Sequence, residues 1–227
     1  FSEADFLPGL IVDKFGACLV IQTLALGMDV YKDIIVSVLD ELLQPEMIYE
    51  RNDASVRTLE GLPLQKGFLK GQGETMLQVR ENGLLFYADI ENGKKTGFFY
   101  DQRDNRRLLS KFVADAEVLD CFCFTGSFSI HAAAYGARHV TGIDISAAAV
   151  EMAKKNAVLN QAQNSCDFQE ANAFDLLREY SDSGRSYDTV ILDPPAFTKS
   201  KSSVESAARG YKEINLRGLK MIRPGGY

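Results

Sequence analysis

Histidine and cysteine are scarce in this sequence, and tryptophan is absent. The 227 residues include two histidines and four cysteines, and only Cys121 and Cys123 stand close together, as C-x-C with no second pair. A structural zinc site takes its Cys and His ligands in paired spacings, so the sequence predicts no metal site. Unpaired cysteines are typical of a reducing compartment, which predicts free thiols and a cytoplasmic protein.

Long apolar runs and targeting signals are also missing. No stretch of about 18 apolar residues is present, which argues against a membrane-spanning helix. The chain does not open with a cationic segment followed by an apolar one, so no secretory signal is predicted. An apolar run starts at Leu10, and the chain stops directly after a Pro-Gly-Gly turn, which predicts a fragment of a longer protein.

Positive charge is in deficit overall but is concentrated near the end of the chain. The formal net charge of −6 argues against a protein that coats nucleic acid along its whole surface. Residues 196–227 nevertheless hold seven Lys or Arg against two Glu, a balance of +5, so the other 195 residues carry −11. A basic patch on an acidic body fits a selective contact with a polyanion. A solvated helix face with i,i+4 ion pairs explains the same charges equally well.

Glycine is rare where a nucleotide-binding loop would need it. Residues 116–146 are typical of a strand, a tight loop, a helix and a second strand that ends at Asp144. Asp144 lies 18 residues after Gly126, near the spacing at which a βαβ unit places a carboxylate on a ribose. Dinucleotide sites need G-x-G-x-x-G, whereas residues 121–126 are Cys-Phe-Cys-Phe-Thr-Gly. The crowded loop predicts an adenosine ligand without phosphates, of which S-adenosylmethionine is the common one. A βαβ unit with no ligand is the alternative.

The order of predicted elements indicates the fold class. From residue 103 onward it is α-β-α-β-α-β-α-β-α, which predicts an α/β fold with a doubly wound, Rossmann-like parallel sheet. Ligands of such sheets lie at the carboxyl ends of the strands, and Asp120, Asp144 and Asp193 all end predicted strands. The expected strands are 116–121, 139–143, 166–169 and 187–192, and the expected later helices are 127–135, 146–159, 172–180 and 204–221.

A small α+β unit is predicted before this sheet, from a hairpin over 10–26, a helix over 29–43 and a strand over 47–50. The glycine-rich stretch between Gly61 and Gly73 is predicted to be a mobile loop. A β-hairpin is expected over 84–100, because Asn92-Gly93 is a strong two-residue turn signal. The predicted domains are 1–82, a hairpin connector over 83–100, and a C-terminally incomplete nucleotide-binding domain over 101–227.

Asp193-Pro194-Pro195 follows a fully apolar predicted strand. The prolines fix the backbone and lack N–H donors, which leaves Asp193 and the adjacent carbonyls as acceptors. Acceptors at a ligand-binding edge can hold the exocyclic amine of a base. An ordinary strand-ending turn is the alternative, and we favour the site because Asp144 and the crowded loop belong to the same sheet.

Three segments in this order, VLDCFCFTGSFS, GIDIS and LDPPAF, resemble motifs of class I S-adenosylmethionine-dependent methyltransferases. Two more, GFFYDQRDNR and RGYKEIN, resemble the bacterial 23S rRNA cytosine-C5 methyltransferase family of the RlmI type, and the likeness covers essentially the whole chain. The resemblance implies a cytoplasmic enzyme that uses S-adenosylmethionine to form 5-methylcytosine in 23S rRNA. The oligomeric state stays open, with a homodimer as one alternative.

The resemblance also implies roles for particular residues. Asp144 would bind the ribose hydroxyls, and Asn172 with Ala173 would meet the adenine. An acidic residue often stands near the position of Asn172 in the usual motif, and its absence leaves this contact to an amide. Asp193 and Pro194 would face the target base. Phe122, Thr125 and Gly126 would line the methionine part, and the segment Tyr100, Asp101, Gln102 and Arg103 would close over the cofactor. Asp120 and Ile145 complete the implied cofactor contacts.

Methylation at carbon-5 of cytosine requires a cysteine thiolate that adds to C6 of an unstacked base. The family would place this cysteine on a strand beyond Tyr227, whereas Cys121 and Cys123 belong to the predicted cofactor loop. The chain alone is therefore predicted to lack its nucleophile.

Three other functions are alternatives to this one. An rRNA guanine-N2 methyltransferase shares the Asp-Pro-Pro step, but amine methylases usually have an aromatic residue directly after it, where this chain has Ala196 and then Phe197. A nicotinamide oxidoreductase is disfavoured by the missing glycines. A non-catalytic RNA-binding module is the third alternative.

Overall fold

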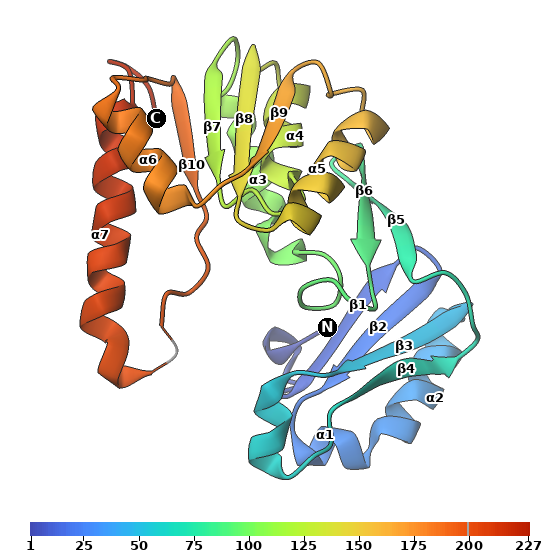
Figure 1. Ribbon diagram of the computed structural model, residues 1–227. Helices are drawn as coiled ribbons and strands as arrows, with labels where there is room; N and C mark the ends of the chain where they lie inside the picture. Colours follow the sequence, from blue (N-terminus) through green and yellow to red (C-terminus); the bar gives the residue numbers. More distant parts are fainter. Residues whose placement is uncertain (199) are drawn as a thin grey trace. The chain divides into compact units, whose positions relative to one another are not determined.

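The computed structural model describes residues 1–198 and 200–227. It consists of two compact units (Figure 1). The first unit contains Phe1–Arg80 and Tyr87–Asp101, and the second contains Glu81–Phe86 and Gln102–Tyr227. Each unit has its own sheet, its own helices and its own apolar core.

The second unit is built on a parallel sheet with the strand order β10-β7-β8-β9. The chain passes from β7 through β8 to β9 and then returns to place β10 on the other side of β7. The order therefore reverses beside β7, and such a reversal is where α/β sheets form their ligand-binding crevice. The doubly wound fold is confirmed. The strands are β7 (Glu117–Cys121), β8 (His139–Asp144), β9 (Cys166–Glu170) and β10 (Thr189–Leu192).

Helices cover both faces of this sheet (Figure 1). On one face lie α4 (Ser127–Ala134) and α5 (Ala147–Leu159), and α3 (Arg103–Leu108) packs against α4. On the other face lie α6 (Ala173–Asp182) and α7 (Val204–Met221), which pack against each other. The Ser146 hydroxyl caps α5 by accepting the N–H of Ala149 at 3.3 Å, as the sequence predicts.

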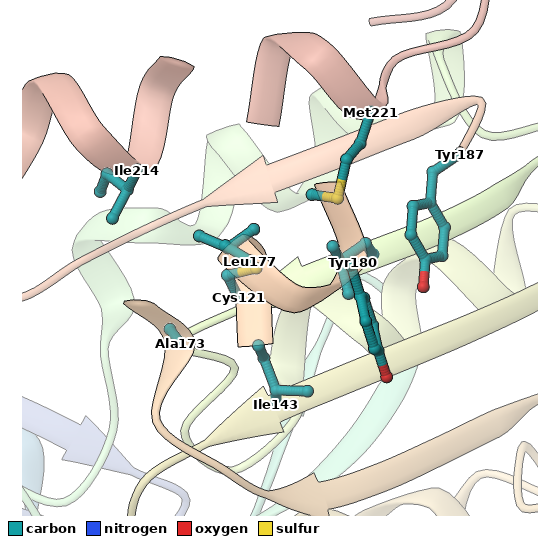
Figure 2. Close-up of a cluster of buried hydrophobic side chains, with 9 residues drawn as sticks. Cys121, Ile143, Ala173, Leu177, Tyr180, Tyr187, Ile214 and Met221 are labelled. Atoms are coloured by element: carbon teal, nitrogen blue, oxygen red, sulfur yellow. The ribbon is translucent and has the colours of Figure 1, made fainter. Parts of the chain in front are cut away.

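The apolar core beneath α6 and α7 determines which way the strand residues point. Leu119 and Cys121 of β7 meet Leu177 of α6 and Met221 of α7 (Figure 2). Since side chains alternate along a strand, Asp120 points to the opposite face, toward α4. A carboxylate is thus buried inside the unit by the same alternation that builds the core.

The first unit has a mixed sheet with the strand order β1-β2-β3-β4. Its inner pair β2 and β3 is parallel and is connected through two helices, while both outer pairs are antiparallel. The predicted mobile glycine-rich loop is wrong in part, because β4 lies within it and pairs with β3. The elements are β1 (Leu10–Phe15), β2 (Cys18–Thr23), α1 (Leu26–Val30), α2 (Lys32–Leu43), β3 (Met47–Asn52) and β4 (Gln65–Lys70).

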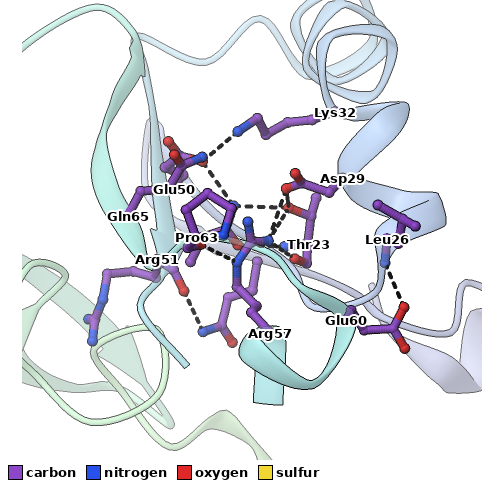
Figure 3. Close-up of polar contacts among 12 residues, drawn as sticks. Thr23, Leu26, Asp29, Lys32, Glu50, Arg51, Arg57, Glu60, Pro63 and Gln65 are labelled. Atoms are coloured by element: carbon purple, nitrogen blue, oxygen red, sulfur yellow. Dashed lines mark hydrogen bonds and ion pairs between the residues drawn. The ribbon is translucent and has the colours of Figure 1, made fainter. Parts of the chain in front are cut away.

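A buried polar network closes the carboxyl ends of β2 and β3 (Figure 3). Arg57 is fully buried and donates from Nε to the Pro63 carbonyl at 3.1 Å and from Nη1 to Oδ1 of Asp29 at 2.9 Å. Asn52 donates to Oγ1 of Thr23 at 2.9 Å. Buried charges are tolerated when they are paired and hydrogen-bonded, so this network stabilises the connection that follows β3.

The β-hairpin lies earlier than the sequence predicts. β5 (Met76–Glu81) pairs with β6 (Leu84–Asp89) around Asn82-Gly83, whose φ angles of 50° and 89° are left-handed. The predicted hairpin over 84–100 is therefore wrong. Asn92 instead donates its N–H to Oδ1 of Asp89 at 2.8 Å, in a turn after β6. The two compact units divide the hairpin between them, and the functional domain boundaries at 82 and 100 stay a prediction.

Candidate cofactor-binding site

Three carboxylates come from the carboxyl ends of three parallel strands in the second unit. Asp120 belongs to β7, Asp144 ends β8, and Asp193 follows β10. Burial, and then the charges of Asp193 and Asp144, raise the pKa of Asp120 to about 7. Asp193 and Asp144 are therefore both close enough to Asp120 to disfavour its charge. A site of this charge favours a cationic ligand and disfavours a phosphate.

Asp120 is the most deeply placed of the three. It is fully buried, and its Oδ2 accepts the hydroxyl of Ser129 at 2.6 Å. Its Oδ1 has no hydrogen-bond partner among the described residues. A buried carboxylate oxygen without a donor is costly, and a cationic group of a ligand would offset this cost.

Asp144 is held by backbone donors on both oxygens. Oδ2 accepts the N–H of Phe124 at 2.9 Å, and Oδ1 accepts the N–H of Ser146 at 2.9 Å. Because a carboxylate oxygen can accept more than one hydrogen bond, both can also receive ligand hydroxyls. Ile145 follows directly and is 70 % exposed, so an exposed apolar side chain lies next to this carboxylate. The roles of the two residues toward a base and a ribose stay predictions.

The loop after β7 has a strained backbone. Phe122 and Phe124 have φ angles of 65° and 48°, in the left-handed region that bulky residues rarely adopt. Each such residue costs about 1–3 kcal/mol and persists only where its surroundings require it. One contact that accompanies this conformation is the hydrogen bond from the N–H of Phe124 to Asp144. The sequence shows that glycine is missing, but only the structure shows that the backbone keeps a conformation suited to glycine.

Gly126 ends this loop as the residue before α4. Its φ is 78°, and a Cβ there would lie 2.9 Å from both Ala153 and the ring of Phe168. Only glycine fits between the loop and α5. The preceding Thr125 carbonyl accepts from Asn156 of α5 at 3.0 Å, so the loop is tied to the helix that follows Asp144.

Asn172 and Ala173 begin α6. Oδ1 of Asn172 accepts the N–H of Phe174 at 2.9 Å, which leaves the amide NH2 for another partner. The Ala173 side chain is buried in the core below α6, so Ala173 could reach an adenine through its backbone only. Of the two predicted adenine contacts, Asn172 therefore offers its side-chain amide, and Ala173 offers only its backbone.

The Asp193-Pro194-Pro195 turn is supported by aromatic rings. The ring of Phe197 lies 4.4 Å from that of Tyr211 and 5.3 Å from that of Phe174, measured between centroids. The Tyr211 hydroxyl donates to the Pro195 carbonyl at 3.5 Å and accepts the N–H of Phe197 at 3.3 Å. Asp193 is exposed beside this cluster. Phe122 packs at the edge of the same cluster, with its ring 6.3 Å from Phe197.

The segment before α3 has local partners for its side chains. In the first unit, the Tyr100 hydroxyl donates to the Lys14 carbonyl at 3.1 Å, and Asp101 pairs with Lys95 at 2.8 Å. In the second unit, Oε1 of Gln102 accepts from Asn105 at 2.7 Å, and exposed Arg103 lies 3.5 Å from Asp104. The roles of these four residues toward a cofactor stay predictions.

The cysteines of this chain are poor nucleophiles. Cys18, Cys121, Cys123 and Cys166 are all buried. Burial raises the pKa of Cys18 to about 11 and that of Cys166 to about 12, and it raises the pKa of both loop thiols further.

We expect a thiol reagent at pH 8 to label none of the four cysteines within minutes in the folded protein and all of them in denaturant, because the thiolate is the reactive species. Rapid labelling of Cys123 in the native state would contradict this.

Residues 1–198 and 200–227 offer neither a metal-ion cluster nor a membrane-spanning helix. This part of the chain has no group of three or more His, Cys, Asp or Glu that could hold a metal ion. It also has no helix that is long and apolar enough to cross a membrane.

The family profile of S-adenosylmethionine-dependent methyltransferases matches residues 51–227, which include the whole of the site above. The chain belongs to this family. Membership confirms the predicted fold class and S-adenosylmethionine as the cofactor of the family, and it decides against the nicotinamide alternative.

Similar proteins agree with this family. The Ribosomal RNA large subunit methyltransferase I of Shewanella amazonensis is 42% identical over 227 residues, and that of Aliivibrio fischeri is 43% identical over 227 residues. This methyltransferase-family chain covers 57% of the length of each of these relatives, while 99% of the chain itself is matched.

Solved structures show the same fold. SMU.776 in complex with SAH superposes with a TM-score of 0.84 at 23% identity, over 99% of this chain and 58% of that one. The M. jannaschii tRNA m1G37 methyltransferase superposes with a TM-score of 0.66 at 21% identity, over 99% of this chain and 60% of that one. At these identities the likeness concerns the fold alone.

Proposed function

We propose that this chain is the cofactor-binding part of an rRNA methyltransferase that forms 5-methylcytosine in 23S rRNA. The observation that carries the proposal is the convergence of Asp120, Asp144 and Asp193 beside the reversal of strand order. Identity of 42% over the whole chain to a protein named Ribosomal RNA large subunit methyltransferase I supports this substrate.

The residues of the site fit S-adenosylmethionine. Asp144 has acceptor capacity left for the ribose hydroxyls, and Ile145 and the free amide NH2 of Asn172 can meet the adenine. The buried, unpartnered Oδ1 of Asp120 suits a cationic ligand group. When bound, the cofactor supplies an electrophilic methyl group. Its sulfonium and ammonium charges match the three carboxylates, whereas a pyrophosphate would be repelled.

Asp193 and the carbonyls of its Pro-Pro step would receive the target base. They are acceptors, and the exocyclic amine of an unstacked cytosine is a donor. The guanine-N2 alternative is weaker, because the ring after this step, that of Phe197, is packed between Phe174 and Tyr211. A ring held in this way is poorly placed to stack on a base.

The thiolate that adds to C6 would come from a part of the longer protein outside these 227 residues. All four cysteines of the chain are buried, and their pKa values are raised by burial. The chain spans little more than half of its curated relatives, which leaves room for a further segment with the nucleophile.

The rRNA contact would involve only part of the basic segment near the end of the chain. Arg217 pairs with Asp182 at 2.7 Å, and Arg223 pairs with Asp188 at 2.8 Å, so these two cations already have carboxylate partners within the chain. Lys199 lies outside the described residues. Lys201 and Lys212 are among the exposed cations that remain for a phosphate backbone. Cytoplasmic localisation and a homodimer stay predictions.

The function is tested in cells that lack the full-length gene. We expect mass spectrometry of their 23S rRNA to show the loss of one 5-methylcytosine, which the full-length gene restores and its Asp144→Ala variant does not. An unchanged set of modified nucleotides in the deletion strain would overturn the proposal. Loss of a methylated guanine instead would support the guanine-N2 alternative.

A further inference from the structure

A buried pair joins the first strand of the parallel sheet to α4. Ser129 and Asp120 are both fully buried, and their side-chain oxygens are 2.6 Å apart. Ser129 is the third residue of α4, where backbone N–H groups have no partner within the helix. The hydroxyl and the backbone N–H of Ser129 both lower the pKa of Asp120, against the larger effect of burial.

The space for this hydroxyl is made by a glycine on the neighbouring strand. A Cβ at Gly142 of β8 would lie 3.0 Å from Oγ of Ser129 and 2.6 Å from the ring of Phe168. A larger residue at this position would have to displace the Phe168 ring and would crowd the serine hydroxyl. The pair is therefore built by three elements, β7, β8 and α4.

The other groups that face Asp120 do not compensate its charge. They are Asp144 from β8 and Asp193 after β10, both of which repel it, and the thiols of Cys121, Cys123 and Cys166, whose pKa values its charge raises. None of these is a cation. The hydrogen bond from Ser129 is thus the main polar contact that holds this carboxylate, while Oδ1 stays without a donor.

We propose that Ser129 is a positioning residue of the cofactor site. This inference rests on the proposed function. The Ser129 hydroxyl fixes Oδ2 of Asp120, so that Oδ1 is left for the ammonium of the amino-acid part of the cofactor. Ser129 itself is not expected to touch the ligand. It acts through Asp120, and it affects the amino-acid part but not the adenosine part.

Calorimetry of the full-length protein with two ligands tests this role. S-adenosylhomocysteine carries both the adenosine and the ammonium, whereas adenosine lacks the ammonium. We expect Ser129→Ala to weaken S-adenosylhomocysteine binding by about tenfold, the worth of one hydrogen bond to a charged group, and to leave adenosine binding unchanged. Ser110→Ala, which removes an exposed hydroxyl bonded to the Arg107 carbonyl, is the matched control and should change neither affinity.

A double-mutant cycle separates positioning from simple packing. In an Asp120→Asn background, Ser129→Ala should change S-adenosylhomocysteine affinity by less than about twofold, since the partner charge is already gone. Circular dichroism and thermal melting check that each variant is folded. Additive losses, or an equal loss of adenosine affinity, would show that Ser129 acts only by packing.

The pH profile gives a second readout. With Asp120 titrating at about 7, affinity for S-adenosylhomocysteine should fall as the pH drops through this value, because the protonated acid no longer attracts an ammonium. Loss of the Ser129 donor raises the pKa of Asp120, so the fall should begin at a higher pH in Ser129→Ala. An unmoved profile overturns the inference. If Asp144→Ala leaves adenosine binding intact, it is the cofactor site itself that is wrong.

Discussion

Replacing Asp144 with alanine should weaken adenosine binding by about 100-fold or more, because the two charge-assisted hydrogen bonds that we propose to the ribose hydroxyls would be lost. The carboxylate is aimed by the N–H groups of Phe124 and Ser146, one on each oxygen. Its orientation is thus present before any ligand arrives, and little binding energy is spent on ordering it. The measurement is calorimetric titration of the full-length protein with adenosine.

A conservative variant tests whether the charge of Asp144, and not only its size, is needed for binding. Asp144→Asn keeps the shape but places an NH2 group against one of the two backbone donors, so it should bind adenosine nearly as poorly as Asp144→Ala. Asp175→Ala is the control, because Asp175 is an exposed carboxylate at the start of α6, 4.0 Å from Arg178. Retention of adenosine affinity in both Asp144 variants would remove the ribose assignment.

Replacing Arg106 with alanine should lower the free energy of unfolding by about 3–5 kcal/mol, since it leaves a buried charge without its partner. Arg106 donates from Nε and Nη2 to the two oxygens of Glu81 at 2.6 and 2.8 Å, and the two side chains are 2% and 1% exposed. Glu81 stands at the end of β5, so this pair holds the hairpin tip on α3 within the second unit.

The buried histidine beside the pair is no substitute for Arg106. His131 lies 3.7 Å from Glu81, but burial lowers its pKa. Its Nδ1 is 2.8 Å from the Ser127 carbonyl and therefore carries the proton, which leaves Nε2 to accept from Asn82 at 3.3 Å. The ring is thus neutral in the folded state and cannot replace Arg106.

Chemical denaturation with matched variants measures this effect. The double variant Glu81→Met/Arg106→Met should lose far less stability than Arg106→Ala, because removing both charges leaves none unpaired. Arg178→Ala, which breaks an exposed pair, should stay within about 0.5 kcal/mol of the parent. A loss below about 1 kcal/mol for Arg106→Ala would contradict a structural role for the pair.

The two Asn-Gly turns show what local sequence can predict about the fold and what it cannot. The chain contains Glu-Asn-Gly twice, at 81–83 and at 91–93, and both are strong local signals for a hairpin. Only the first forms one. The second is held by Asp89, whose Oδ1 accepts the N–H of Asn92, and by Arg51, whose Nη2 donates to the Gly93 carbonyl at 2.9 Å. Arg51 stands on β3, far away in sequence, so no local pattern could reveal this contact.

The sequence by itself determined the element order of the parallel sheet, the acids at its strand ends and the class of ligand. These follow from short-range properties: apolar periodicity, the glycine before a helix, and the spacing from Gly126 to Asp144. The tertiary structure alone decided that the loop keeps a left-handed backbone at Phe122 and Phe124, and that Ser129 holds Asp120. The physical reason is that backbone strain and buried hydrogen bonds depend on groups that β7, β8 and α4 bring together. These groups are distant in the sequence, so no single segment predicts their contacts.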